Sequence, residues 1–181
     1  LARPQVMNGS FDKLRLVGTY GAFGVVADQR EELIIESACD INGPWKEYHF
    51  KVKPGDVYRK PPWISPYHHR LDWQLWIASQ SGRVERSLWI FSLLLKLLRQ
   101  EKDVLDLIES DPWITTPTNT SGESNTDDNI NEKPKFIRIE KYRYKFVHPS
   151  EHSKQYWQRE RVGCYFPRQG VVTAEMLEEV V

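Results

Sequence analysis

Four residues that could carry out chemistry lie within five consecutive positions of the chain: His68, His69, Arg70 and Asp72. Imidazole and carboxylate groups transfer protons and bind metal ions, and a guanidinium group binds anions. Tryptophans flank them in the stretch PPWISPYHHRLDWQLW, residues 61–76. One hypothesis is therefore an enzyme that uses these four residues as a catalytic or metal site.

The spacing of the two histidines argues against a metal ion. Adjacent side chains point about 100° apart on a helix and to opposite faces of a strand. Zinc ligands usually lie on the same side of an element, as His69 and Asp72 would on a helix, but nothing in the sequence selects a third ligand. We therefore predict no metal and no cofactor. We expect Arg70 and Asp72 to hold a loop at the start of a helix through hydrogen bonds and an ion pair.

The cysteines and asparagines carry weaker signals. Cys39 and Cys164 form no CxxC pair, and they leave two alternatives open: two buried thiols, or a disulfide between them. Two Asn-x-Ser/Thr triplets begin at Asn8 and Asn119 and are candidate glycosylation sites of a secretory protein. The sequence contains no GxSxG elbow and no glycine-rich phosphate loop.

A basic and aromatic segment, residues 133–145, would suit a nucleic-acid surface if the chain as a whole were basic. Lys and Arg total 25, as do Asp and Glu, so the formal net charge is zero. The segment also alternates as a strand does, with charged and aromatic side chains on opposite faces. We therefore interpret it as part of a sheet and predict no nucleic-acid partner.

The order of elements predicts an α+β fold. Alternating apolar residues indicate three strand regions: 14–35, 45–53 and 136–146. Apolar residues at helical spacing indicate three helical regions: 71–79, 87–109 and 171–181. Residues 156–166 fit either a helix or a strand. We predict an antiparallel-rich sheet with the central helices packed on one face.

Local signals refine these elements. In 45–53, Tyr48, Phe50 and Val52 share the apolar face, whereas Lys53 falls on the solvent face. The apolar positions of 136–146 change parity, which predicts a bulge near Glu140–Lys141 or two short strands. For the helices, the expected N-caps are Ser87 and Thr173, with a break near Asp103 in the second helix.

Length and hydropathy indicate one domain, residues 1–181. Residues 115–133 are mostly Ser, Thr, Asn, Asp and Gly, and we expect a disordered polar loop there. The most apolar run, 88–98, is about half as long as a membrane span requires. The chain begins LARPQ and ends LEEVV, so we expect a segment of a longer protein.

Five stretches, in order, resemble the lipase maturation factor family: TYGAFG (19–24), WKEYHFKVKPGD (45–56), PPWISPYHHRLDWQLW (61–76), EKYRYKF (140–146) and RVGCYFP (161–167). They extend across nearly the whole chain, and the first is closer to the first of the two vertebrate paralogues. Within these stretches we take the following residues as a structural signature: Tyr20, Gly21, Phe23, Gly24, Trp45, Tyr48, Pro54, Gly55, Arg70, Asp72, Trp73, Tyr142 and Tyr144.

The resemblance implies a location and a role. Members of this family are multi-pass proteins of the endoplasmic reticulum membrane, so this segment would be a lumenal domain, with the transmembrane helices outside it. Its partners would be immature homodimeric lipases (lipoprotein, hepatic and endothelial lipase), whose folding, dimer assembly and secretion the family supports. Because no catalytic reaction is established for the family, the resemblance implies a chaperone-like glycoprotein that binds its client, and not an enzyme.

Overall fold

The computed structural model describes residues 29–113, 133–148 and 154–181. Signature residues 20–24, the glycosylation candidates Asn8 and Asn119, and nearly all of the expected polar loop 115–133 lie outside the described residues. Residues 31–181 form one unit. The elements along the described chain are β1 (Arg30–Ala38), β2 (Lys46–Glu47), α2 (Arg70–Ser81), the 3-10 turn η1 (Val84–Arg86), α3 (Trp89–Leu98), α4 (Lys102–Leu105), β3 (Phe136–Phe146), β4 (Trp157–Phe166) and α5 (Ala174–Glu178).

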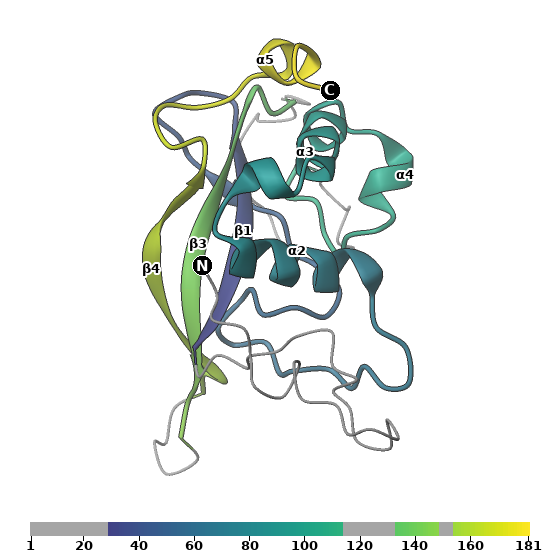
Figure 1. Cartoon of the computed structure of the whole chain (residues 1–181). Helices are drawn as coiled ribbons and strands as arrows, with labels where there is room; N and C mark the ends of the chain where they lie inside the picture. Colours follow the sequence, from purple (N-terminus) through teal and green to yellow (C-terminus); the bar gives the residue numbers. More distant parts are fainter. Residues whose placement is uncertain (1–28, 114–132, 149–153) are drawn as a thin grey trace, which may run out of the picture. The chain divides into compact units, whose positions relative to one another are not determined.

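The strands form one sheet in the order β2-β1-β3-β4. The β1–β2 and β3–β4 pairs are antiparallel. The amide of Lys135, just before β3, donates to the carbonyl of Ala38 at the end of β1, which places the start of one strand beside the end of the other. Helices α2, α3 and α4 lie along one side of the sheet (Figure 1). The predicted α+β class, an antiparallel sheet with central helices on one face, is confirmed.

The main core lies between the sheet and these helices. Alternate residues of a strand point to opposite faces, so Leu33 and Ile35 of β1 share one face. They join Ile137 and Ile139 of β3 and the apolar stripe of α3 in one buried cluster. A second, smaller cluster contains Ile34, Tyr144 and Trp157. Because Ile34 has the opposite parity to its neighbours, β1 is buried on both faces.

The pairing of β3 with β4 is irregular near Glu140 and Lys141, where a bulge was predicted. The register shifts between Ile139 and Glu140 and again between Lys141 and Tyr142. Both extra residues lie in the partner strand, where Tyr165 and Val162 of β4 have no opposite residue in β3. The change of parity within β3 has another reason: Ile137 and Ile139 belong to the main core, whereas Tyr144 belongs to the second cluster on the other face of the sheet. The ambiguous segment 156–166 is a strand, β4.

Two details of the prediction are wrong. The strand predicted over 45–53 is reduced to β2, followed by a single bridge between His49 and Ser110. Lys53, expected in solvent, is only 5% exposed. The second is the start of α3: its N-cap is Leu88 and makes no side-chain capping bond, so Ser87 is not the cap. The helix breaks between Leu98 and Lys102, slightly before the expected position.

The described residues include no helix that is both long and apolar enough to cross a membrane.

Candidate functional site

Asp72 holds a loop in place from the first turn of α2. Its Oδ1 accepts hydrogen bonds from the backbone amides of Val52 at 2.7 Å and Lys53 at 2.9 Å. The residue is only 3% exposed. A carboxylate in this position is also favoured by the partial positive charge of the helix N-terminus. Asp72 therefore joins α2 to a segment some twenty positions earlier in the chain.

Three more side chains hold the same segment, residues 50–55, which we call the clamped loop. The Lys53 ammonium turns inward, donates to the Leu33 carbonyl at 2.7 Å and lies 3.8 Å from the carboxylate of Glu32. The Tyr144 hydroxyl donates to the Gly55 carbonyl at 2.8 Å. The guanidinium of Arg59 donates to the carbonyls of Phe50 and Lys51. Helix α2 and strands β1 and β3 thus all contact one loop.

Other signature residues also serve the packing. Burial raises the pKa of the Tyr144 hydroxyl to about 12, as expected for a phenol that stays neutral inside the fold. Tyr48 is buried, accepts a hydrogen bond from Ser37 at 3.1 Å, and its pKa is also raised by burial. Pro54 is buried within the clamped loop. Guanidinium groups stack on two more aromatic rings of the signature, with Arg138 over Trp45 and Arg159 over Tyr142.

The expected ion pair between Arg70 and Asp72 does not form. Arg70 is exposed, and no ion pair joins it to another residue in the part of the chain that the structure describes. Instead, the Oδ1 atom of Asp72 accepts its hydrogen bonds from the two backbone amides of the loop. The structural role predicted for Asp72 therefore rests on different partners from those expected.

The two histidines lie in an open setting. His68 and His69 are exposed and directly precede α2. A cavity of about 290 Å³ beside them is lined by His69, Arg70 and Asp72 but not by His68, together with Lys51, Leu71, Gln74 and Leu107. Within 29–113, 133–148 and 154–181, no three His, Cys, Asp or Glu side chains gather closely enough to hold a metal ion. The geometry does not bring the four residues of the enzyme hypothesis together around one point.

The cysteines are not joined to each other. Cys39 donates its thiol to the Lys133 carbonyl at 3.5 Å, and Cys164 donates to the Pro167 carbonyl at 2.9 Å. Of the two alternatives left open by the sequence, the disulfide is therefore absent from this structure. The other alternative, two buried thiols, is not met either, because Cys39 is half-buried and Cys164 is exposed.

Acidic residues of β1 neutralise the basic residues of β3. Arg138 pairs with Glu36 at 2.7 Å, and the side chains of Lys141 and Arg143 both reach Glu31. Neighbouring strands of one sheet thus supply both signs of charge. Arg138, Lys141 and Arg143 of the basic and aromatic run therefore have charge partners within the sheet.

The tryptophans divide into packed and exposed residues. Trp157 is buried, and Trp45, Trp76, Trp89 and Trp113 are half-buried. Trp63 is 88% exposed and Trp73 is 43% exposed. Trp63 belongs to the segment between the clamped loop and α2, which also exposes Tyr67 to 84%. The stretch that carried the enzyme hypothesis therefore presents aromatic side chains to solvent.

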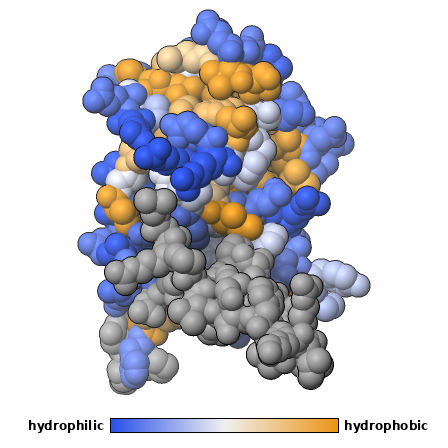
Figure 2. All heavy atoms as spheres, viewed as in Figure 1, coloured by the Kyte–Doolittle hydropathy of each residue, from blue (hydrophilic) through white to orange (hydrophobic). Residues whose placement is uncertain are grey.

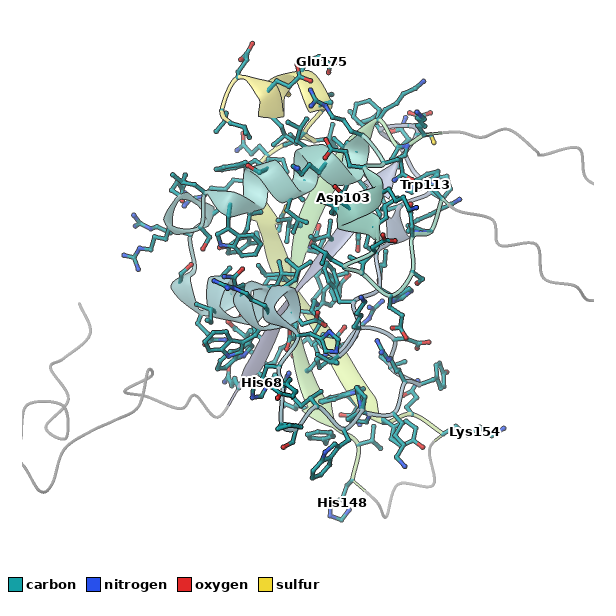
Figure 3. All side chains as sticks on the ribbon, turned by 90° about the vertical axis from the view of Figure 1, so that its right-hand side faces the viewer. His68, Asp103, Trp113, His148, Lys154 and Glu175 are labelled. Carbon is teal, nitrogen blue, oxygen red and sulfur yellow. The ribbon has the colours of Figure 1, made fainter. Side chains whose placement is uncertain are left out.

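Further exposed apolar side chains come from the ends of β3 and β4. The amide of Tyr156 donates to the Val57 carbonyl at 2.9 Å, and the Gln155 side chain donates to the Tyr58 hydroxyl. Figure 3 shows His68, His148 and Lys154 toward one end of the molecule and Glu175 at the other. We define the aromatic end by its exposed large side chains: Tyr58, Trp63, Ile64, Tyr67, Phe146 and Tyr156.

A second apolar area lies at the far end. Figure 2 shows apolar residues at the surface around α5. Met176, Val180 and Val181 are exposed there. This area contains no aromatic residue in the set of exposed large side chains, which distinguishes it from the aromatic end.

Comparison with known proteins decides the family. A model of the lipase maturation factor C-terminal domain matches residues 16–167. The chain belongs to the lipase maturation factor family. Lipase maturation factor 1 of Mus musculus is 41% identical over 175 residues, and that of Homo sapiens is 38% identical, each match covering 92% of this chain. Lipase maturation factor 2 of Mus musculus is 32% identical over 165 residues, 88% of the chain.

The family resemblance seen in the motifs, including the greater similarity to lipase maturation factor 1, is thereby confirmed. The chain spans 28% of the length of the lipase maturation factor 1 relatives and 21% of that of the mouse lipase maturation factor 2. No solved structure matches the chain.

Proposed function

We propose that this chain is the lumenal, client-binding domain of an endoplasmic reticulum chaperone for lipases, and that the aromatic end contacts the client. Its clients would be immature homodimeric lipases, and the domain would assist their folding, dimer assembly and secretion without catalysing a reaction. Two features support the family role in this chain: its membership of the lipase maturation factor family, and an exposed aromatic surface. In this setting Asn8 and Asn119 are candidates for glycosylation.

The single observation that carries the proposal is the exposure of Trp63 and Tyr67. Large aromatic side chains usually lie in the core, and a cluster of them in solvent marks an interaction surface. Tryptophan and tyrosine also dominate binding energy where proteins meet. The segment that carries Trp63 and Tyr67 lies between two anchored elements, the clamped loop and α2. Its prolines, Pro61, Pro62 and Pro66, restrict it further, which reduces the entropy lost on binding.

We expect the double variant Trp63→Ser, Tyr67→Ser of the full-length protein to support about fivefold less lipase secretion than the unmodified protein, since two central aromatic contacts are lost. The measurement is secreted lipoprotein lipase activity from cells that lack their own maturation factor. Full-length protein is needed because the chain spans only part of the relatives.

The matched control is Met176→Ser, which removes an exposed apolar side chain at the opposite end. It should leave secretion unchanged. Both variants should keep the thermal stability of the unmodified protein, because the altered side chains are exposed. Full secretion with the double variant, at equal protein level, would contradict the proposal.

A further inference from the structure

Among the described residues, the segments that form the aromatic end carry basic side chains and no acidic ones. The described segments 57–71, 144–148 and 154–158 contain no aspartate or glutamate. They contain five lysines and arginines: Arg59, Lys60, Arg70, Lys145 and Lys154. Since the whole chain has a formal net charge of zero, acidic residues are concentrated elsewhere. Positive charge and aromatic surface therefore coincide at one end.

Most of this positive charge has no ion-pair partner among the described residues. Arg59 pairs with Glu109. By contrast, the described part of the chain offers no ion pair to the other four: Lys60, Arg70, Lys145 and Lys154. All four are exposed. Elsewhere on the surface, side chains such as Arg138 and Arg159 do meet carboxylates. The unpaired cations are thus available to a binding partner.

We infer that the aromatic end selects client segments that combine aliphatic and acidic side chains. This inference rests on the proposed function and names the class of segment that the proposed surface takes. Apolar side chains of such a segment would pack on Trp63 and Tyr67, while its carboxylates would lie near the surrounding ammonium and guanidinium groups. A basic segment would meet like charges, which disfavours binding.

Because the four cations are exposed, they should change the dissociation constant of a bound segment only modestly. Exposed ion pairs are weak individually and are screened by salt. Two or three of them acting together would change the dissociation constant about fivefold, so charge selects among apolar segments and does not replace apolar contact. Preference for the acidic segment should therefore fall as ionic strength rises.

The test uses three fluorescent twelve-residue peptides that alternate leucine with glutamate, glutamine or lysine. Binding to the full-length protein in detergent is followed by anisotropy at low and at high salt. We expect the glutamate peptide to bind about fivefold more tightly than the glutamine peptide, and the lysine peptide to bind most weakly. The difference should shrink at high salt.

Charge reversal provides the matched comparison. Lys60→Glu with Lys154→Glu should invert the order of the glutamate and lysine peptides. Lys102→Glu with Lys135→Glu makes the same change in net charge at exposed lysines outside the aromatic end and should leave the order unchanged. Equal binding of all three peptides, or an equal effect of both double variants, would overturn the inference. So would binding of the aromatic end to phosphatidylserine vesicles without any binding of the peptides.

The two proposals fail in different ways. Loss of lipase secretion in the Trp63→Ser, Tyr67→Ser variant, together with no charge preference among the peptides, would overturn the inference and leave the proposed function standing. Normal secretion in that variant would contradict the proposed function itself.

Discussion

Replacing Asp72 by alanine is expected to lower the free energy of unfolding by about 3 kcal/mol. The variant removes a buried charged acceptor and leaves the amides of Val52 and Lys53 without the bonds they make to it. An unsatisfied buried donor bears its full desolvation cost. Urea unfolding followed by tryptophan fluorescence measures the change.

The neighbouring variant Arg70→Ala serves as its control. Arg70 lies in the same turn of α2 but is exposed, so its removal should change stability by less than about 0.5 kcal/mol. If Asp72→Ala were no more destabilising than Arg70→Ala, the clamped loop would not depend on the carboxylate. Asp72 would then not be the residue that stabilises the joint between α2 and the clamped loop.

Replacing Lys53 by methionine is expected to cost about 3 kcal/mol as well, for a different reason. The Glu32 side chain is fully buried, and the Lys53 ammonium lies 3.8 Å from its carboxylate. Removing one member of a buried pair leaves the other charge poorly compensated, whereas removing both is much less harmful. Thermal or urea unfolding again gives the difference.

A double-mutant cycle separates the contribution of the charge pair to stability from the contribution of side-chain packing. The variant Lys53→Met, Glu32→Leu should recover much of the stability that Lys53→Met alone loses, because no buried carboxylate remains. A double variant that is as unstable as the sum of the two single variants would show that the two charges do not act as a pair.

The sequence predicts the sheet better than it predicts the loop. The strand over 136–146 could be foreseen because alternation of side chains is a local property of a strand, whereas the extra residues of the irregular pairing lie in its partner, β4. The buried Lys53 could not be foreseen, because alternation assigns every lysine to solvent. Its burial depends on Glu32 and on the Leu33 carbonyl, which lie about twenty positions earlier in the chain.

The residues of the candidate surface were also hard to predict, because their exposure depends on contacts between distant parts of the chain. Motif reading singled out the stretch from His68 to Asp72, and Asp72 does hold a loop. The functional surface that we propose includes Phe146 and Tyr156, which the sequence analysis did not single out. Whether an aromatic residue near a strand end is buried depends on its neighbours in the sheet, and β4 lies at the edge of this one. The absence of acidic residues from 57–71 is the one signal in the sequence that marks the surface.

Signature residues hold the clamped loop, and the clamped loop precedes the segment that exposes Trp63 and Tyr67. Asp72, Lys53 and Tyr144 bury their polar groups in holding residues 50–55, which lead directly into the exposed segment. The side chains most characteristic of the motifs thus stabilise the base from which Trp63 and Tyr67 project. If the proposed function is right, the residues that keep the fold are separate from the residues that would meet the client.

Photo-crosslinking tests the central claim most directly. Benzoylphenylalanine placed at position 63 or position 176 of the full-length protein, with newly made lipoprotein lipase in the same cells, reports which end touches the client. We predict a crosslinked lipase from position 63 and none from position 176. Crosslinking from position 176 alone, with lipase still secreted in active form, would contradict the assignment of the client surface to the aromatic end.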